Sequence, residues 1–228
     1  GIEKARGEYI IHLDGDDTLY EETTLEKIHC LIGEEHPDTA DSYHEIGGIH
    51  FYLGEYDQAL KFCYKALNIE EQVLGEEHSA TASSYNSIAI IYKYLGNFNK
   101  ALEYNNKVLE IRKNLFGEEH PDTATSYNNI GAVYESLGNL DKSLNFHKKA
   151  LEIRKQILGD EHPITATSYN NMGVIYFYLG EFNKALTYHN KALEIQVKIL
   201  GEEHPETIIS YNGLGTVYRS LNKYEKAL

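Results

Sequence analysis

The chain is built from a 42-residue unit that recurs in register. A glycine three positions before a histidine marks each recurrence, at Gly33, Gly75, Gly117, Gly159 and Gly201. The windows 117–158 and 159–200 are identical at 25 of 42 positions without a gap. Repeated segments of this length form one supersecondary unit per copy, and each copy buries its apolar faces by stacking on its neighbours. The repeat therefore predicts a solenoid in place of a single globular core.

The apolar residues within one unit follow a helical period. Tyr85, Ile88 and Tyr92 fall on one face of a helix, and a second apolar stripe runs through residues 98–115. Gly96 separates the two stripes, and glycine readily ends a helix in a left-handed conformation. Each unit is therefore predicted to be two antiparallel helices joined by a Leu-Gly turn. The expected fold class is all-α, with the pairs stacked in an α-α superhelix.

The order of residues in the unit resembles the tetratricopeptide repeat: an aromatic, an apolar and a small residue, an aromatic, Leu-Gly, an aromatic and Ala. The 42-residue period with Leu-Gly-Glu-Glu-His-Pro is similar to the longer variety found in kinesin light chains. The resemblance covers residues 30–228 and implies a right-handed superhelix of four full repeats with partial repeats at both ends. Two positions depart from the pattern, because His50 stands in place of a tyrosine and Asn222 in place of the turn glycine.

Residues 1–29 form an atypical leader that lies outside the repeat. Within residues 1–28, the segment from Ala5 to Asp17 resembles the strand and Asp-x-Asp segment of family-2 glycosyltransferases, and the resemblance implies that Asp14 and Asp16 hold a divalent metal. The first motif of the haloacid dehalogenase superfamily is a second resemblance. It implies Asp14 as nucleophile and Asp16 as general acid and base, with Thr18 completing the motif.

Neither enzyme is complete in this sequence. A glycosyltransferase needs earlier strands that cradle the nucleotide, and a dehalogenase-type phosphatase needs later lysine and aspartate motifs, where this chain has repeats. A solvated acidic turn that caps the solenoid, or a remnant of a fusion, is the favoured interpretation of Asp14 and Asp16. We therefore expect a protein that is not an enzyme, with no cofactor and no metal site.

Charge and composition exclude several kinds of partner. The chain has 35 acidic and 21 basic residues, a formal net charge of −14, whereas a nucleic-acid-binding protein needs a basic surface to neutralise phosphates. The apolar runs are only a few residues long, far short of the roughly 20 that span a bilayer. Two cysteines, Cys30 and Cys63, cannot form a disulfide framework. We expect a cytoplasmic protein that binds neither nucleic acid nor membrane.

Histidines beside paired acids recur once per unit and carry residue types that zinc uses: His36, His78, His120, His162 and His204. A spacing of 42 residues places them about one helix pair apart, whereas zinc ligands converge at roughly 2.0 to 2.2 Å. We interpret them as residues at helix starts. His147 and His189 lie within second helices, where packing or an outer face is expected.

An asparagine directly follows the core tyrosine of four first helices, although asparagine lowers helix stability by roughly 0.5 kcal/mol or more relative to alanine. In tetratricopeptide arrays the first helices line a concave groove, so the resemblance implies that these amides face a bound peptide. Helical spacing adds further side chains to this predicted groove. Its residues are Asn86, Ile90, Lys93, Tyr94, Asn128, Asn170, Val174, Phe177, Tyr178, Asn212 and Arg219.

Two interpretations of the asparagines stay open. Their amides can donate to and accept from a peptide backbone, or they can bond to one another across adjacent helices as an internal ladder. The groove is favoured, because solenoids present concave binding surfaces. The sequence thus predicts a non-catalytic, adaptor-like scaffold that binds a peptide or a partner protein. The alternative is the recruitment array of a glycosyltransferase.

Overall fold

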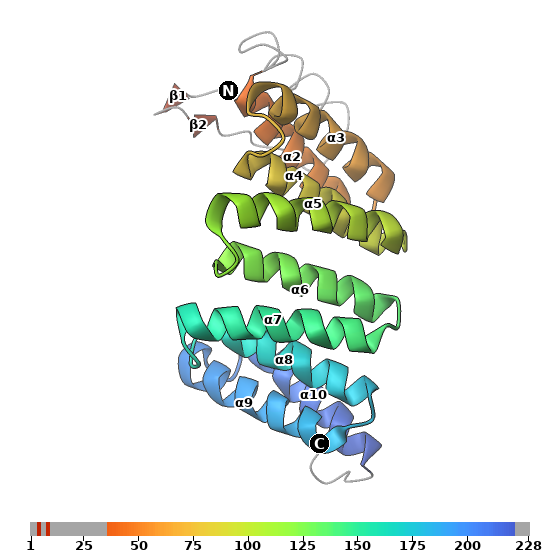
Figure 1. Cartoon of the computed structure of the whole chain (residues 1–228), viewed down its shortest axis with the longest axis vertical. Helices are drawn as coiled ribbons and strands as arrows, with labels where there is room; N and C mark the ends of the chain where they lie inside the picture. Colours follow the sequence, from red (N-terminus) through yellow and green to blue (C-terminus); the bar gives the residue numbers. More distant parts are fainter. Residues whose placement is uncertain (1–3, 6–7, 10–35, 222–228) are drawn as a thin grey trace. The chain divides into compact units, whose positions relative to one another are not determined.

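The computed structural model describes residues 4–5, 8–9 and 36–221. Strands β1 (Lys4–Ala5) and β2 (Glu8–Tyr9) pair antiparallel. Nine α-helices follow in the described part of the chain (Figure 1). They are α2 (Pro37–Tyr52), α3 (Tyr56–Val73), α4 (Ser79–Tyr94), α5 (Phe98–Phe116), α6 (Pro121–Ser136), α7 (Leu140–Leu158), α8 (Pro163–Tyr178), α9 (Phe182–Leu200) and α10 (Pro205–Ser220). Asp14, Asp16, Thr18, Asn222 and the predicted boundary between residues 29 and 30 lie outside the described residues.

The contacts between helices follow the sequence repeat. They divide the chain into two units, Gly1–Gly75 and Glu76–Leu228. In the first unit, α2 packs against α3. In the second unit, α4 packs against α5, α6 against α7 and α8 against α9, and each second helix also contacts the first helix of the following pair. The predicted all-α solenoid of helix pairs is therefore confirmed.

The recurring histidines begin the first helices, as the sequence predicts. Each is the N-cap residue, and its Nδ1 accepts a hydrogen bond of 3.2 Å from the backbone N–H two residues further on. A cap of this kind satisfies one of the backbone donors that a helix start leaves without a partner. Four of these histidines precede a proline in the first helical turn, where its missing N–H is harmless. Within residues 36–221, no cluster of three histidine, cysteine or acidic residues suits a metal ion.

The Leu-Gly turn between paired helices is a Schellman motif. Gly96 has a φ of 72°, in the left-handed region that favours glycine. Its N–H donates to the carbonyl of Lys93 at 3.0 Å, and the Asn97 N–H donates to the carbonyl of Tyr92 at 2.9 Å. The same pair of bonds recurs after α6 and α8. The turn glycine thus reverses the chain between antiparallel helices.

Within the second unit, residues that face each other across paired helices have complementary sizes: the smaller the residue on the first helix, the larger the polar residue on the second. Gly131 faces His147 and Gly173 faces His189, so each glycine leaves room for an imidazole ring. The equivalent positions in the α4–α5 pair hold Ala89 and the smaller side chain of Asn105. Both histidines are only 2% exposed. In these two pairs, a histidine of the second helix therefore fills the space that a glycine of the first helix leaves.

His189 is held between two helices. A Cβ atom placed on Gly173 would lie 2.7 Å from His189 Nε2, and one placed on Gly213 of the next repeat would lie 2.6 Å from His189 Cε1. Both distances are shorter than van der Waals contact. The imidazole therefore has no room to retreat from either glycine.

We predict that Gly173→Ala destabilises the protein by about 1 to 3 kcal/mol, because overpacking outweighs the roughly 1 kcal/mol that alanine gains in a helix. Gly48→Ala is the control, since a Cβ there meets nothing within 4 Å, and it should be neutral or stabilising. Adding His189→Asn to Gly173→Ala recreates the Ala89–Asn105 pair and should restore part of the loss. Urea denaturation measures all three, and a Gly173→Ala protein as stable as the wild type would contradict the overpacking.

Burial keeps the two core histidines neutral. It lowers the pKa of His147 to about 4, assisted by the positive charges of Arg154 and Lys93, and it lowers the pKa of His189 to about 4. The Nδ1–H of His147 donates to Asn128 Oδ1 at 3.1 Å, and that of His189 donates to Asn170 Oδ1 at 3.0 Å. An amide oxygen only accepts, so these bonds fix the proton on Nδ1.

We predict that the free energy of unfolding falls as the pH drops from about 6.5 to 4. Unfolded histidine, with a pKa of about 6.5, binds protons in this range that the folded protein excludes, which removes about 2 to 3 kcal/mol per histidine. Denaturation curves at pH 6.5, 5.5 and 4.5 measure the effect. The double variant His147→Asn and His189→Asn should lose most of this dependence, and an unchanged pH profile in that variant would count against the prediction.

Candidate functional site

Asparagines of adjacent first helices form a hydrogen-bonded ladder. Asn129 Nδ2 on α6 donates to Asn86 Oδ1 on α4 at 2.9 Å. One repeat later, Asn171 Nδ2 on α8 donates to Asn128 Oδ1 on α6 at 2.7 Å. The carbonyl oxygens of Asn86 and Asn128 are therefore used between repeats. The ladder differs from the one that the sequence left open, because the donors are Asn129 and Asn171, each one residue after a recurring asparagine. It joins α4 to α6 and α6 to α8.

The ladder changes at its last step. Gly213 occupies the position 42 residues after Asn171, so α10 has no side-chain amide at the donor position of the ladder. Asn170 Nδ2 instead donates to Ser210 Oγ, and the Asn170 side chain is only 4% exposed. The sequence places Asn170 on the peptide-facing surface. The structure corrects this prediction, because bonds to His189 and Ser210 hold its amide in the interior.

A second polar row joins each second helix to the following first helix, and the sequence reasoning missed it. Arg154 on α7 donates from Nη1 to Ser168 Oγ at 2.7 Å and from Nη2 to Thr125 Oγ1 at 3.3 Å. Arg112 on α5 bonds Ser126 Oγ in the same way at 3.0 Å. The arginines and serines each recur 42 residues apart, which is the signal that could have revealed the row. The row fixes the register between repeats.

The remaining predicted groove residues lie on the first helices at or near the surface. Ile90, Val174 and Phe177 are partly exposed, as is Lys93, whereas Asn212 and Arg219 are exposed. Tyr94 and Tyr178 stand out, since 60% and 58% of their surfaces are accessible. The predicted set therefore divides into amides that bond within the structure, Asn86, Asn128 and Asn170, and a surface row. The surface row consists of Ile90, Lys93, Tyr94, Val174, Phe177, Tyr178, Asn212 and Arg219.

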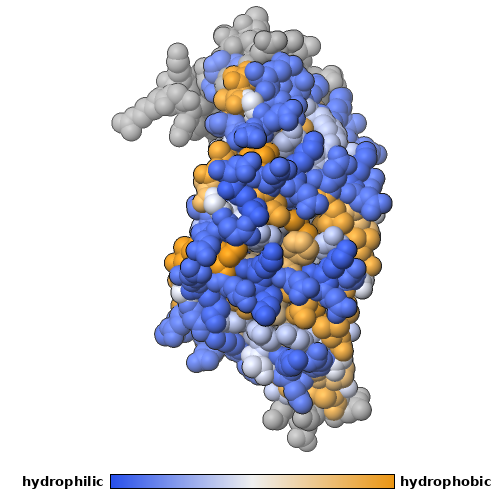
Figure 2. All heavy atoms as spheres, viewed as in Figure 1, coloured by the Kyte–Doolittle hydropathy of each residue, from blue (hydrophilic) through white to orange (hydrophobic). Residues whose placement is uncertain are grey.

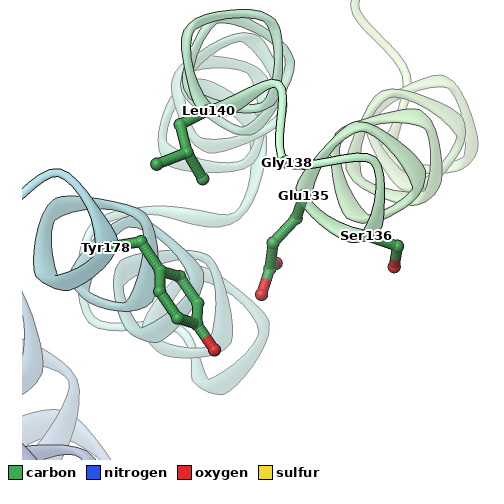
Figure 3. A pocket seen from close by; sticks show the side chains of 5 residues that line it. All are labelled: Glu135, Ser136, Gly138, Leu140 and Tyr178. Carbon is green, nitrogen blue, oxygen red and sulfur yellow. The ribbon is translucent and has the colours of Figure 1, made fainter.

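One open pocket of about 540 Å³ adjoins this surface row. Its lining comes from the end of α6, the turn that follows, the start of α7 and the end of α8: Glu135, Ser136, Gly138, Leu140 and Tyr178. Figure 3 shows the Glu135 carboxylate and the Tyr178 ring on two sides of one space, with Leu140 above it. The Ser136 hydroxyl points away and donates to the Ala132 carbonyl at 3.0 Å. Glu135 is not among the groove residues predicted from the sequence, although Lys93 and Phe177 at the equivalent positions of the neighbouring repeats are.

A helix that spans a bilayer must be both long and apolar. Among the helices that the structure describes, none combines the length and apolarity needed to cross a membrane. Figure 2 shows a face on which hydrophilic side chains predominate and hydrophobic ones form smaller patches. That mixture is typical of helices with one packed and one solvated face.

We predict that Asn128→Ala destabilises the protein by about 1 to 3 kcal/mol. The substitution removes the acceptor of both Asn171 and His147, and a buried donor without a partner loses free energy of this size. Asn212→Ala is the matched control at the equivalent, exposed position, and it should be neutral or slightly stabilising. Thermal and urea denaturation compare the two variants, and equal effects would contradict a structural role for the ladder.

Comparisons with known proteins agree with the observed fold. A comparison with curated protein sequences finds no match. Solved structures do match. BtubC (BKLC) from P. vanneervenii superposes with a TM-score of 0.75 at 22% identity, covering 91% of this chain and 84% of that one. A putative kinesin light chain with nearly identical TPR-like repeats from Podosopora anserina gives 0.69 at 23%, covering 84% of this chain and 91% of that one. At these identities the likeness shows the fold alone.

A third structure and a family model complete the comparison. The apo form of RapI superposes with a TM-score of 0.69 at 21% identity, and the match covers 90% of this chain and 56% of that one. The family model described as tetratricopeptide repeat matches residues 38–114, 95–156, 122–196 and 165–228, so nearly the whole helical part is covered. Repeats of this kind generally serve as non-catalytic scaffolds for protein–protein interaction. The chain belongs to the tetratricopeptide repeat family.

Proposed function

We propose that this chain is a non-catalytic, adaptor-like scaffold that binds a peptide or an extended segment of a partner protein. The binding surface is the row of first-helix side chains in the second unit, α4 to α10. We also infer a cytoplasmic location, because the described cysteine, Cys63, is a buried free thiol and the composition suits a reducing compartment.

The observation that carries the proposal is the exposure of Tyr94 and Tyr178, at 60% and 58%, at the ends of two first helices. Large aromatic side chains give up little conformational entropy on binding and dominate many interfaces. Ile90 and Val174, four residues earlier on the same helices, are partly exposed and extend each tyrosine with apolar surface. Together they supply anchor points on two different repeats.

The two polar rows support this role by holding the repeats in register. Bonds such as Asn171 to Asn128 and Arg154 to Ser168 link neighbouring repeats below the surface row. Because the ladder uses the amide oxygens, the expected peptide contacts shift from Asn86 and Asn128 to the side chains beside them. Preorganised anchors of this kind reduce the entropy lost on binding.

We predict that Tyr94→Ala and Tyr178→Ala each weaken peptide binding by about tenfold without changing the denaturation midpoint. Peptides are selected from a random displayed library on the purified chain, and their affinities are measured by calorimetry. Ile157→Ala and Ile199→Ala are the controls, since both isoleucines are exposed on second helices, at 41% and 47%. Peptides whose affinity falls in the control variants and not in the tyrosine variants would place binding elsewhere.

A further inference from the structure

We infer that the pocket between α6, α7 and α8 is a subsite for a cationic side chain, lysine or arginine, of the bound peptide. This inference rests on the proposed function and specifies the chemistry of the partner. The Glu135 carboxylate is the charged group of the pocket, Tyr178 supplies an aromatic face, and Leu140 supplies an apolar wall (Figure 3).

Glu135 is a partly buried carboxylate that forms no ion pair within the described part of the chain. Its side chain is partly buried, and burial raises the pKa of its carboxyl group, while the charge of Lys93 on the neighbouring first helix acts in the opposite direction. No basic side chain in the described part of the chain forms an ion pair with Glu135, in contrast to exposed acids such as Glu118 and Glu161, which pair with lysines. A partly desolvated carboxylate that forms no ion pair gains more from a bound cation than a fully solvated one does.

The other walls of the pocket suit the two parts of a basic side chain. A lysine or arginine side chain has an apolar stem and a charged head, which need different surroundings. Leu140 offers an apolar surface for the stem. The exposed ring of Tyr178 can take the head by a cation–π contact while Glu135 takes it by a charge-assisted hydrogen bond. An acidic side chain would meet repulsion from the same carboxylate.

The combination of a glutamate with a tyrosine one repeat later, as in Glu135 and Tyr178, occurs once in the second unit. The positions equivalent to Glu135 in the neighbouring repeats hold Lys93 and Phe177, and a serine replaces the tyrosine at the positions equivalent to Tyr178 on α6 and α10. Since the backbone repeats, the fold does not require a carboxylate at residue 135. A lysine at the equivalent position in α4 shows that the helix tolerates either charge.

The test uses the full chain and small probes that carry one side chain each. N-acetyl-arginine amide and N-acetyl-lysine amide are titrated while the NMR signals of the Gly138 and Tyr178 backbone amides are followed, with N-acetyl-norleucine amide as the uncharged control. We expect saturable shifts with the two cations and at least tenfold weaker binding of norleucine. Equal binding of norleucine would overturn the cation subsite.

Variants separate charge from shape. Glu135→Gln should weaken the cationic probes by about tenfold, and Glu135→Lys, which copies Lys93, should abolish their binding. Glu110→Gln removes an equal charge from an exposed position on α5 and should leave binding unchanged. A Glu135→Gln protein that binds the cations as well as the wild type does would overturn the inference.

The peptide selection described above keeps this test distinct from that of the proposed function. Peptides enriched in lysine or arginine, with affinities that fall in Glu135→Gln, would support both conclusions. If the selected peptides depend on Tyr94 but are not enriched in lysine or arginine, the proposed scaffold function stands and the cation subsite is overturned. If no peptide binds the tyrosine surface, the proposed function fails, and the small probes alone decide whether the pocket selects cations.

Discussion

Each helix pair of this protein has more apolar surface than it can bury within itself, and this constraint determines the rest of the structure. A first helix packs on its own second helix along one face and on the preceding second helix along another, as α6 does on α7 and α5. Stability is therefore distributed over interfaces between repeats, as in a one-dimensional array. Residues at those interfaces must fit both their own helix pair and the neighbouring pair, whereas residues on the remaining surface can vary.

The interfaces of the second unit contain buried polar side chains, and their hydrogen-bond partners explain why these groups are tolerated. Amides, imidazoles and guanidinium groups lie between helices, where a polar group without a hydrogen-bond partner would lower the free energy of unfolding by about 1 to 3 kcal/mol. The asparagine ladder and the Arg154–Ser168 bond satisfy most of them. Directional bonds of this kind oppose sliding of one repeat along the next, which apolar contacts alone resist weakly. Polar pairing thus gives the array its register.

The sequence was sufficient to predict the helix pairs, the turn glycines and the histidine N-caps, because these depend on local periodicity and on backbone conformations that few residues adopt. It was insufficient to decide between groove and ladder for Asn128, since both interpretations place an amide on the same helical stripe. Only the distance between helices decides which partner the amide reaches. The hydrogen-bond partner of Asn170 could not be predicted for the same reason. Gly213, 43 residues away, has no side-chain amide to donate, and the Asn170 amide bonds to Ser210 instead.

The pocket at Glu135 shows where specificity can arise in such an array. Ladder asparagines, core tyrosines and turn glycines are repeated, so they cannot distinguish one repeat from another. In the four first helices of the second unit, the position that holds Lys93, Glu135, Phe177 and Arg219 belongs to neither polar row and carries a different residue in each. A ligand that lies across several repeats therefore meets the same scaffold with a different charge or ring at each step. The order of those side chains, basic, acidic, aromatic and basic, would then define the complementary order of groups in the partner.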